Sequence, residues 1–264
     1  MIKRLVFIPL AFLFSVTVSL VATYLVAVRP MRRSWGIDPA ETARTLPGDE
    51  FVPEAGITDT RGISIEAAPE AVWPWLPQMG YGRAGWYSYD RLDNKGGSAT
   101  RLMPEHGTLA LGDIVPTWPG GGFRVEAIDP GHSLVLYLDT ELANVQADEA
   151  RAGEGDSTGN PATGNAATAA NLKAAGAMGN AAMPIFKATW AFVVEPVDPT
   201  HTRLIERFRV WSPEPTLPQR AFLPMLGLGV FVMTRKQMLG LKQRAEGTVI
   251  APAPLAQSEL DTAA

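Results

Sequence analysis

The stretch TRGISIEAAPEAVWPWLPQMGYGRAGWYSY, residues 60–89, carries the strongest local signals in the chain. Residues 61–66 alternate between apolar and polar side chains, a period that predicts a β-strand. Pro69 then suits the first turn of a helix, and two further prolines keep that helix short. The glycine-rich residues 81–87 predict a loop, because glycine adopts backbone conformations that other residues avoid. The stretch therefore predicts a strand, a short helix and an aromatic loop in succession.

Later parts of the chain return to a period of two. Alternating or continuous apolar patterns occupy residues 109–115, 123–127, 133–139, 186–195 and 202–211. Turn sequences rich in Asp, Pro and Gly separate the later ones. Strands that follow one another with short turns pair as antiparallel hairpins with one apolar face. These residues predict an antiparallel sheet.

The strand predicted over 202–211 has two unlike faces. Glu206 falls among apolar residues on one face, whereas Arg203, Arg207 and Arg209 line the other. We expect the arginine face to be exposed to water. The carboxyl group of Glu206 is the best candidate for a polar group inside the apolar side of the sheet.

A long helix is predicted over residues 218–246. The run 223–233 contains no charged residue, and the helix becomes basic and amphipathic after it. The apolar part, residues 221–234, is shorter than the roughly 20 residues that span a bilayer. We therefore expect a buried helix that covers the apolar face of the sheet, not a second transmembrane span.

The amino-terminal region predicts a membrane anchor. Residues 5–28 contain no charged residue, which at about 1.5 Å per residue is long enough to cross a hydrocarbon core. The alternative is a cleaved signal peptide, whose apolar region is usually about 7–15 residues. Arg29, Arg32 and Arg33 follow the apolar run, and their excess over the two basic residues before it favours a cytoplasmic domain. We expect a single-pass protein of the cell membrane.

These signals divide the chain into four parts. We expect an anchor with basic flanks over residues 1–33, a tether over 34–59 and one domain over 60–247. Residues 248–264 predict a disordered tail. Within the domain, residues 141–184 are rich in Ala, Gly and Asn, lack aromatic residues and predict a disordered insertion.

Composition excludes several classes of function. A net charge of −4 and a pI near 5.5 argue against nucleic-acid binding, which needs a basic face. The chain has no cysteine, so it has no disulfide, thiolate catalysis or Cys-ligated metal site. His106, His132 and His201 lack the spacing of metal ligands, and no phosphate-binding loop is present. We expect no metal and no cofactor.

Residues 63–73, ISIEAAPEAVW, resemble the opening of the START-like (SRPBCC) superfamily, which includes polyketide cyclases and lipid-transfer proteins. The motifs WPWL at 73–76, QMG at 78–80, GWYSYD at 85–90 and LGD at 111–113 are similar to those of an uncharacterised, membrane-anchored bacterial branch. The resemblance implies an α+β helix-grip fold, in which a curved antiparallel sheet wraps around the long carboxyl-terminal helix and leaves a cavity between them. It says little about function, because one fold hosts many activities.

The resemblance places a ligand in that cavity. Aromatic residues of the 82–89 loop could gate it or could be plain core, and Glu206 could be an acid–base group or a carboxylate paired with an arginine. The candidate ligand-binding residues are Trp86, Tyr87, Tyr89, Trp190, Phe192, Glu206 and Phe208.

Three functions fit the sequence. We expect a membrane-tethered, non-enzymatic binder of a hydrophobic small molecule or lipid, because no catalytic constellation is evident. The alternatives are a cyclase or aromatase that uses Glu206 as acid–base, and a structural module that recruits a protein partner.

Overall fold

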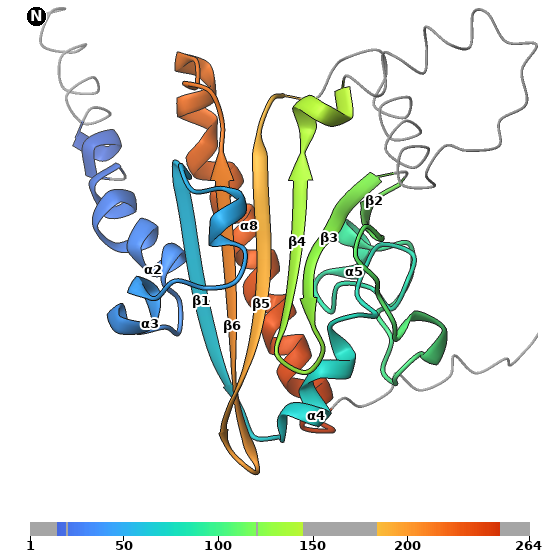
Figure 1. The fold of residues 1–264 in the computed structure, drawn as a ribbon. Helices are drawn as coiled ribbons and strands as arrows, with labels where there is room; N and C mark the ends of the chain where they lie inside the picture. Colours follow the sequence, from blue (N-terminus) through green and yellow to red (C-terminus); the bar gives the residue numbers. More distant parts are fainter. Residues whose placement is uncertain (1–14, 20, 120, 145–183, 249–264) are drawn as a thin grey trace, which may run out of the picture.

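The computed structural model describes residues 15–19, 21–119, 121–144 and 184–248. These residues form a six-stranded antiparallel sheet and a long carboxyl-terminal helix, α8 (Leu217–Ala245), which confirms the predicted α+β class. In Figure 1, α8 crosses one face of the sheet, and the amino-terminal helical segment lies at the edge where β1 is found. The predicted disordered insertion and tail lie almost entirely outside the described residues, although residues 140–144 are helical.

The sheet has the strand order β1-β6-β5-β4-β3-β2, so the first strand pairs with the last. Strands β2 to β6 are neighbours in sequence order, as expected for hairpins. The strands are β1 (Ile57–Ile65), β2 (Ile114–Trp118), β3 (Gly121–Asp129), β4 (Ser133–Asp139), β5 (Lys187–Asp198) and β6 (His201–Trp211).

Short helical segments surround the sheet. The predicted helix after Pro69 is present as an α-helical turn followed directly by a 3-10 turn. The segments are η1 (Tyr24–Val28), α2 (Arg29–Arg33), α3 (Pro39–Ala43), η2 (Asp49–Phe51), α4 (Pro69–Val72), η3 (Trp73–Trp75), α5 (Asp90–Asp93) and η4 (Pro104–His106).

The core lies between the sheet and the second half of α8. Alternate residues of β5, including Trp190 and Phe192, point to this side, as their spacing predicts. They meet Met238 and Leu241 of α8, which are completely buried. This layer fixes α8 against the sheet.

The expectation that the arginine face of β6 is exposed to water is wrong. Residues 36–53 cover it, and they supply the carbonyl and carboxylate acceptors that guanidinium groups need. Arg203 donates to Gly36 O and to Glu41, and Arg207 donates to Asp49 Oδ2 at 2.7 Å. Arg209 donates to the backbone carbonyl groups of residues 52 and 53. The predicted tether is therefore partly a cover for the sheet.

Two details of residues 36–65 complete this part of the fold. Asp38 caps α3 and exchanges hydrogen bonds with Glu41 in a capping box. Strand β1 begins at Ile57, four residues earlier than the alternation predicts. The longer strand brings Asp59 to the inner face of the sheet together with Arg61.

The prediction that α8 is a buried helix is correct only for its second half. Between residues 225 and 232 several apolar side chains are exposed, and Met225 keeps 63% of its surface. In Figure 1 this part of α8 extends toward the same end of the molecule as the amino-terminal helical segment. Among the described residues, no helix is both long enough and apolar enough to cross a membrane. Residues 5–14 of the predicted anchor lie outside the described residues.

Candidate ligand-binding site

Glu206 belongs to a buried ion-pair network. It lies opposite Arg61 in the β1–β6 pairing, and Arg61 Nη1 donates to Glu206 Oε2 at 3.0 Å. The other carboxylate oxygen accepts a hydrogen bond from Trp190 Nε1 at 2.8 Å. Glu206 and Arg61 have no exposed surface. With both oxygens occupied and no access to solvent, Glu206 has the arginine-paired environment that the sequence left open.

The same network joins the sheet to α2. Arg61 Nη2 donates to Asp59 Oδ2 at 2.9 Å, and Arg32 Nη1 of α2 donates to the same oxygen at 3.3 Å. Arg61 Nε donates to the backbone oxygen of Arg32. Arg33 Nε of α2 lies 3.7 Å from the other oxygen of Asp59. Two buried carboxylates thus face three guanidinium groups, of which those of Arg32 and Arg61 are themselves buried. Removal of one partner would leave a buried charge without compensation.

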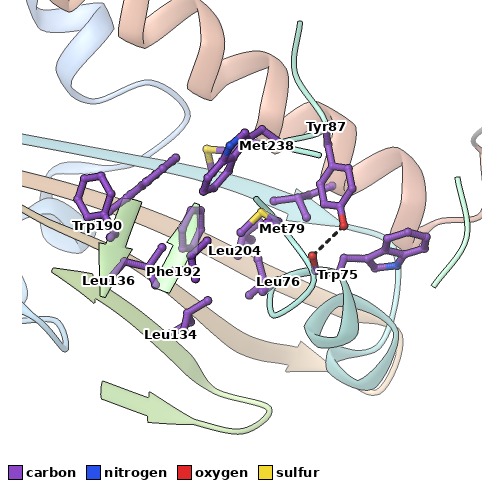
Figure 2. Close-up of a cluster of buried hydrophobic side chains, with 14 of the residues drawn as sticks. Trp75, Leu76, Met79, Tyr87, Leu134, Leu136, Trp190, Phe192, Leu204 and Met238 are labelled. Atoms are coloured by element: carbon purple, nitrogen blue, oxygen red, sulfur yellow. Dashed lines mark hydrogen bonds between the residues drawn. The ribbon is translucent and has the colours of Figure 1, made fainter. Parts of the chain in front are cut away.

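Aromatic side chains fill the space in which the helix-grip resemblance implies a cavity. Trp190 stacks on Trp86 with ring centroids 5.0 Å apart. The centroids of the Phe192 and Phe208 rings lie 5.2 and 6.1 Å from that of Trp190. Figure 2 shows Trp190 and Phe192 within a continuous cluster that also includes Leu136, Leu204 and Met238. Trp86, Trp190, Phe192 and Phe208 therefore form core in this structure.

Tyr87 is also part of the core and does not act as a gate. Its hydroxyl donates to Trp75 O at 3.0 Å and accepts from Gln78 Nε2 at 2.7 Å. Figure 2 draws the first of these bonds. Burial raises the pKa of the Tyr87 phenol well above its ordinary value. Its φ of 58° is unusual for a residue with a side chain, and the surrounding contacts hold it there.

Tyr89, two residues later, lies in a different environment. It lines an open groove of about 390 Å³ between the amino-terminal segment and α8. This volume is within the range of about 300–1,000 Å³ that small-molecule sites have. The lining residues are Met31, Trp35, Tyr89, Phe231, Val232 and Arg235.

The groove is lined by apolar and aromatic side chains and by one cationic group. Five of its six lining residues are apolar or aromatic, and the sixth is Arg235. The guanidinium carbon of Arg235 lies 5.1 Å from the centroid of the Trp35 ring, so the ring orients the cation at the groove. An apolar chain with an anionic end has the matching chemistry.

The groove lies next to the buried ion-pair network. Phe231 lines the groove and is almost fully buried, and Arg61 Cζ lies 5.8 Å from the centroid of its ring. Arg32, next to Met31 on α2, is hydrogen-bonded to Asp59. The network therefore fixes the two walls of the groove relative to each other.

Of the seven predicted site residues, only Tyr89 lines the groove. The sequence reasoning missed Met31, Trp35, Phe231, Val232 and Arg235. Phe231, Val232 and Arg235 share one signal, the charge-free run 221–234 within α8 that is followed at once by a basic residue. Met31 and Trp35 belong to a segment about 200 residues away in the sequence. Among the described residues no cluster of His, Asp and Glu side chains is arranged to hold a metal ion.

No protein-family model and no curated protein sequence matches the chain. Solved structures similar to parts of it include protein MLL2253 from Mesorhizobium loti, with 14% identity, 74% of this chain and 100% of that chain covered, and a TM-score of 0.34. A conserved protein of unknown function, EF2215 from Enterococcus faecalis, has 11% identity, coverages of 77% and 84%, and a TM-score of 0.32. The hypothetical protein jhp0584 from Helicobacter pylori has 12% identity, coverages of 74% and 96%, and a TM-score of 0.32. Similarities this low carry no argument about function.

Proposed function

We propose that the protein is a membrane-tethered domain that binds a hydrophobic small molecule or lipid with an anionic end. The observation that carries the proposal is the groove, which is lined by five apolar or aromatic side chains and by one cation, Arg235. An acyl or isoprenoid chain would lie against Phe231 and Val232, and its carboxylate or phosphate would pair with Arg235. The charge-free residues 5–28 support the tether.

We also propose that the fold is a helix-grip variant of the START-like type. The motifs in residues 63–90, the antiparallel sheet and the long last helix support this assignment. In this variant the ligand occupies the groove on the outside of α8 and not a cavity beneath it. The packing of Trp190 against Trp86, Phe192 and Phe208 supports this location.

No observation favours an acid–base function for Glu206. Its oxygens are occupied by Arg61 and Trp190, and it has no exposed surface. We therefore propose that Glu206 stabilises the groove walls through Arg61. The proposed function remains that of a non-enzymatic binder.

Native mass spectrometry of the full chain, released from lipid nanodiscs, tests this function. Val232 is 43% exposed, so Val232→Trp fills the groove without disturbing the core. The matched control is Leu111→Trp, at a position that is 67% exposed and does not line the groove. We expect one amphiphile to be retained by the unmodified chain and by the control, and to be lost from Val232→Trp. Equal retention by all three, or retention by none, would contradict the proposal.

A further inference from the structure

The first half of α8 presents an apolar stripe that no described part of the chain covers. Met225, Leu228 and Val232 follow one another at helical spacing on one face, and Leu226 lies next to them. Their exposed fractions range from 39% to 63%. Side chains of this kind, gathered on one face of a helix, mark an interaction surface.

The charges around the stripe indicate what it contacts. No charged residue occurs between Arg220 and Arg235, and both arginines are exposed. These fourteen residues of helix extend roughly 21 Å, which is too short to cross a bilayer but suits a helix that lies in its interface. Arg220, near the start of α8, pairs with the exposed Glu214 just before the helix. We therefore place that end of the helix at the level of the headgroups.

The stripe is next to the segment that we propose enters the membrane. Helix α2 contacts α8 where Gly227 leaves room for the Arg32 guanidinium, and a Cβ atom at this glycine would overlap it. The helical residues just before α2 are apolar, and Val21, Leu25 and Val26 are exposed. The apolar surface of the amino-terminal segment and that of α8 therefore lie on adjoining helices.

We propose that this stripe docks the domain onto the surface of a lipid bilayer that contains anionic headgroups. The proposal rests on the proposed membrane anchor, residues 5–28, which tethers the domain. The anchor delivers the domain, and the stripe fixes its orientation, so that the groove opens at the lipid interface. Anionic headgroups neutralise Arg235 and Arg29, the basic residue that directly follows the anchor. A second copy packed through the same stripe would instead bring these cations together.

The absence of native cysteine permits a direct test with the full chain. Single cysteines at Met225→Cys and Leu228→Cys are spin-labelled, and the protein is reconstituted into phosphatidylcholine–phosphatidylglycerol vesicles at no more than one copy per vesicle. Leu111→Cys, in an exposed loop, is the matched control. Flotation of the vesicles reports the tether, and collisions of the label with oxygen and with a water-soluble nickel chelate report its depth.

We expect the protein to float with the vesicles. At positions 225 and 228 we expect several-fold fewer collisions with the nickel chelate and more with oxygen than at position 111. Flotation with equal nickel access at all three positions would overturn the docking and leave the tether intact. Protection that appears only when several copies share a vesicle would show a contact between copies and would also overturn it. A failure to float would contradict the tether and the docking together.

Discussion

The two halves of α8 differ in what covers their apolar side chains. Toward the sheet, the second half of the helix meets a core in which Met238 and Leu241 have no exposed surface. Toward the amino-terminal segment, the first half leaves a groove and an exposed stripe. The difference shows that apolar composition alone does not locate a binding site, because the second half of α8 is closely packed against the sheet and the first half is not.

Phe192→Ala should give the largest effect. This side chain is completely buried in the core, so its truncation should lower the free energy of unfolding by about 3–5 kcal/mol, from lost burial and an unfilled cavity. Val232→Ala, at the groove, should change it by less than about 0.5 kcal/mol. Urea unfolding in detergent, followed by tryptophan fluorescence, measures both. Similar losses for the two variants would mean that the groove is as closely packed as the core.

Arg61→Met should rank next, with a loss of about 3 kcal/mol or more, because it leaves Asp59 and Glu206 buried without their shared cation. It should also loosen the groove and weaken retention of the amphiphile, since Arg61 supports Phe231. Arg44→Met is the control, because it breaks a partly exposed pair with Glu195 that should contribute no more than about 1 kcal/mol. The same unfolding and native mass measurements apply. If both variants lose the same stability, the buried network is not what fixes the walls.

The tyrosines at 87 and 89 make a smaller, matched comparison. Tyr87→Phe removes a hydroxyl that bonds Trp75 O and Gln78, which should cost about 1–3 kcal/mol of stability. Tyr89→Phe should leave stability unchanged, and Tyr89→Ala should reduce amphiphile retention because the ring lines the groove. Thermal unfolding together with native mass spectrometry separates the two effects. A stability loss at residue 89, or none at residue 87, would reverse our assignment of core and groove.

The cover over the outer face of the sheet should give the smallest effect and a dependence on pH. The Arg203 guanidinium, which bonds Glu41, lowers the pKa of that carboxyl. A folded-state pKa below the value of about 4.3 in an unfolded chain means that the ionised group stabilises the fold above that pH. This contribution is lost as the pH falls through the lower, folded-state pKa.

Glu41→Gln should therefore be slightly less stable than the unmodified chain at pH 7, and equally stable at pH values well below 4. Unfolding curves at both pH values check this prediction. A difference that persists at low pH would show that Glu41 acts through packing and not through its charge.

The sequence predicted β3 to β6 and α8 well, because period-two alternation and a long helical pattern are local signals. The strand predicted over residues 109–115 overlaps β2 only at residues 114 and 115. Trp190 and Phe192 were correctly placed on the inner face, but spacing does not show whether such residues line a cavity or fill it. That outcome depends on how their rings meet Trp86 and Phe208 from other parts of the chain.

Only part of the buried ion-pair network could be predicted from the sequence. Period two puts Arg61 on the same face as Ile63 and Ile65, and the predicted strand included it, but the strand was started too late to include Asp59. The pairing of Arg61 with Glu206 depends on the register between the first and last strands. The groove was missed because its walls, Met31 to Trp35 and Phe231 to Arg235, come together only through the β1–β6 pairing and the Arg32–Asp59 bond.

Photo-crosslinking of the full chain in nanodiscs, with a fatty acid that carries a photoreactive group along its chain, tests the location of the site most directly. Cross-linked peptides are identified by mass spectrometry, with and without an excess of unlabelled fatty acid. We predict competed cross-links in the peptides that contain Trp35 and Phe231, and their loss in Val232→Trp. Competed cross-links at Trp190 or Phe192, with none at Trp35 and Phe231, would contradict the account and return the ligand to the space beneath α8.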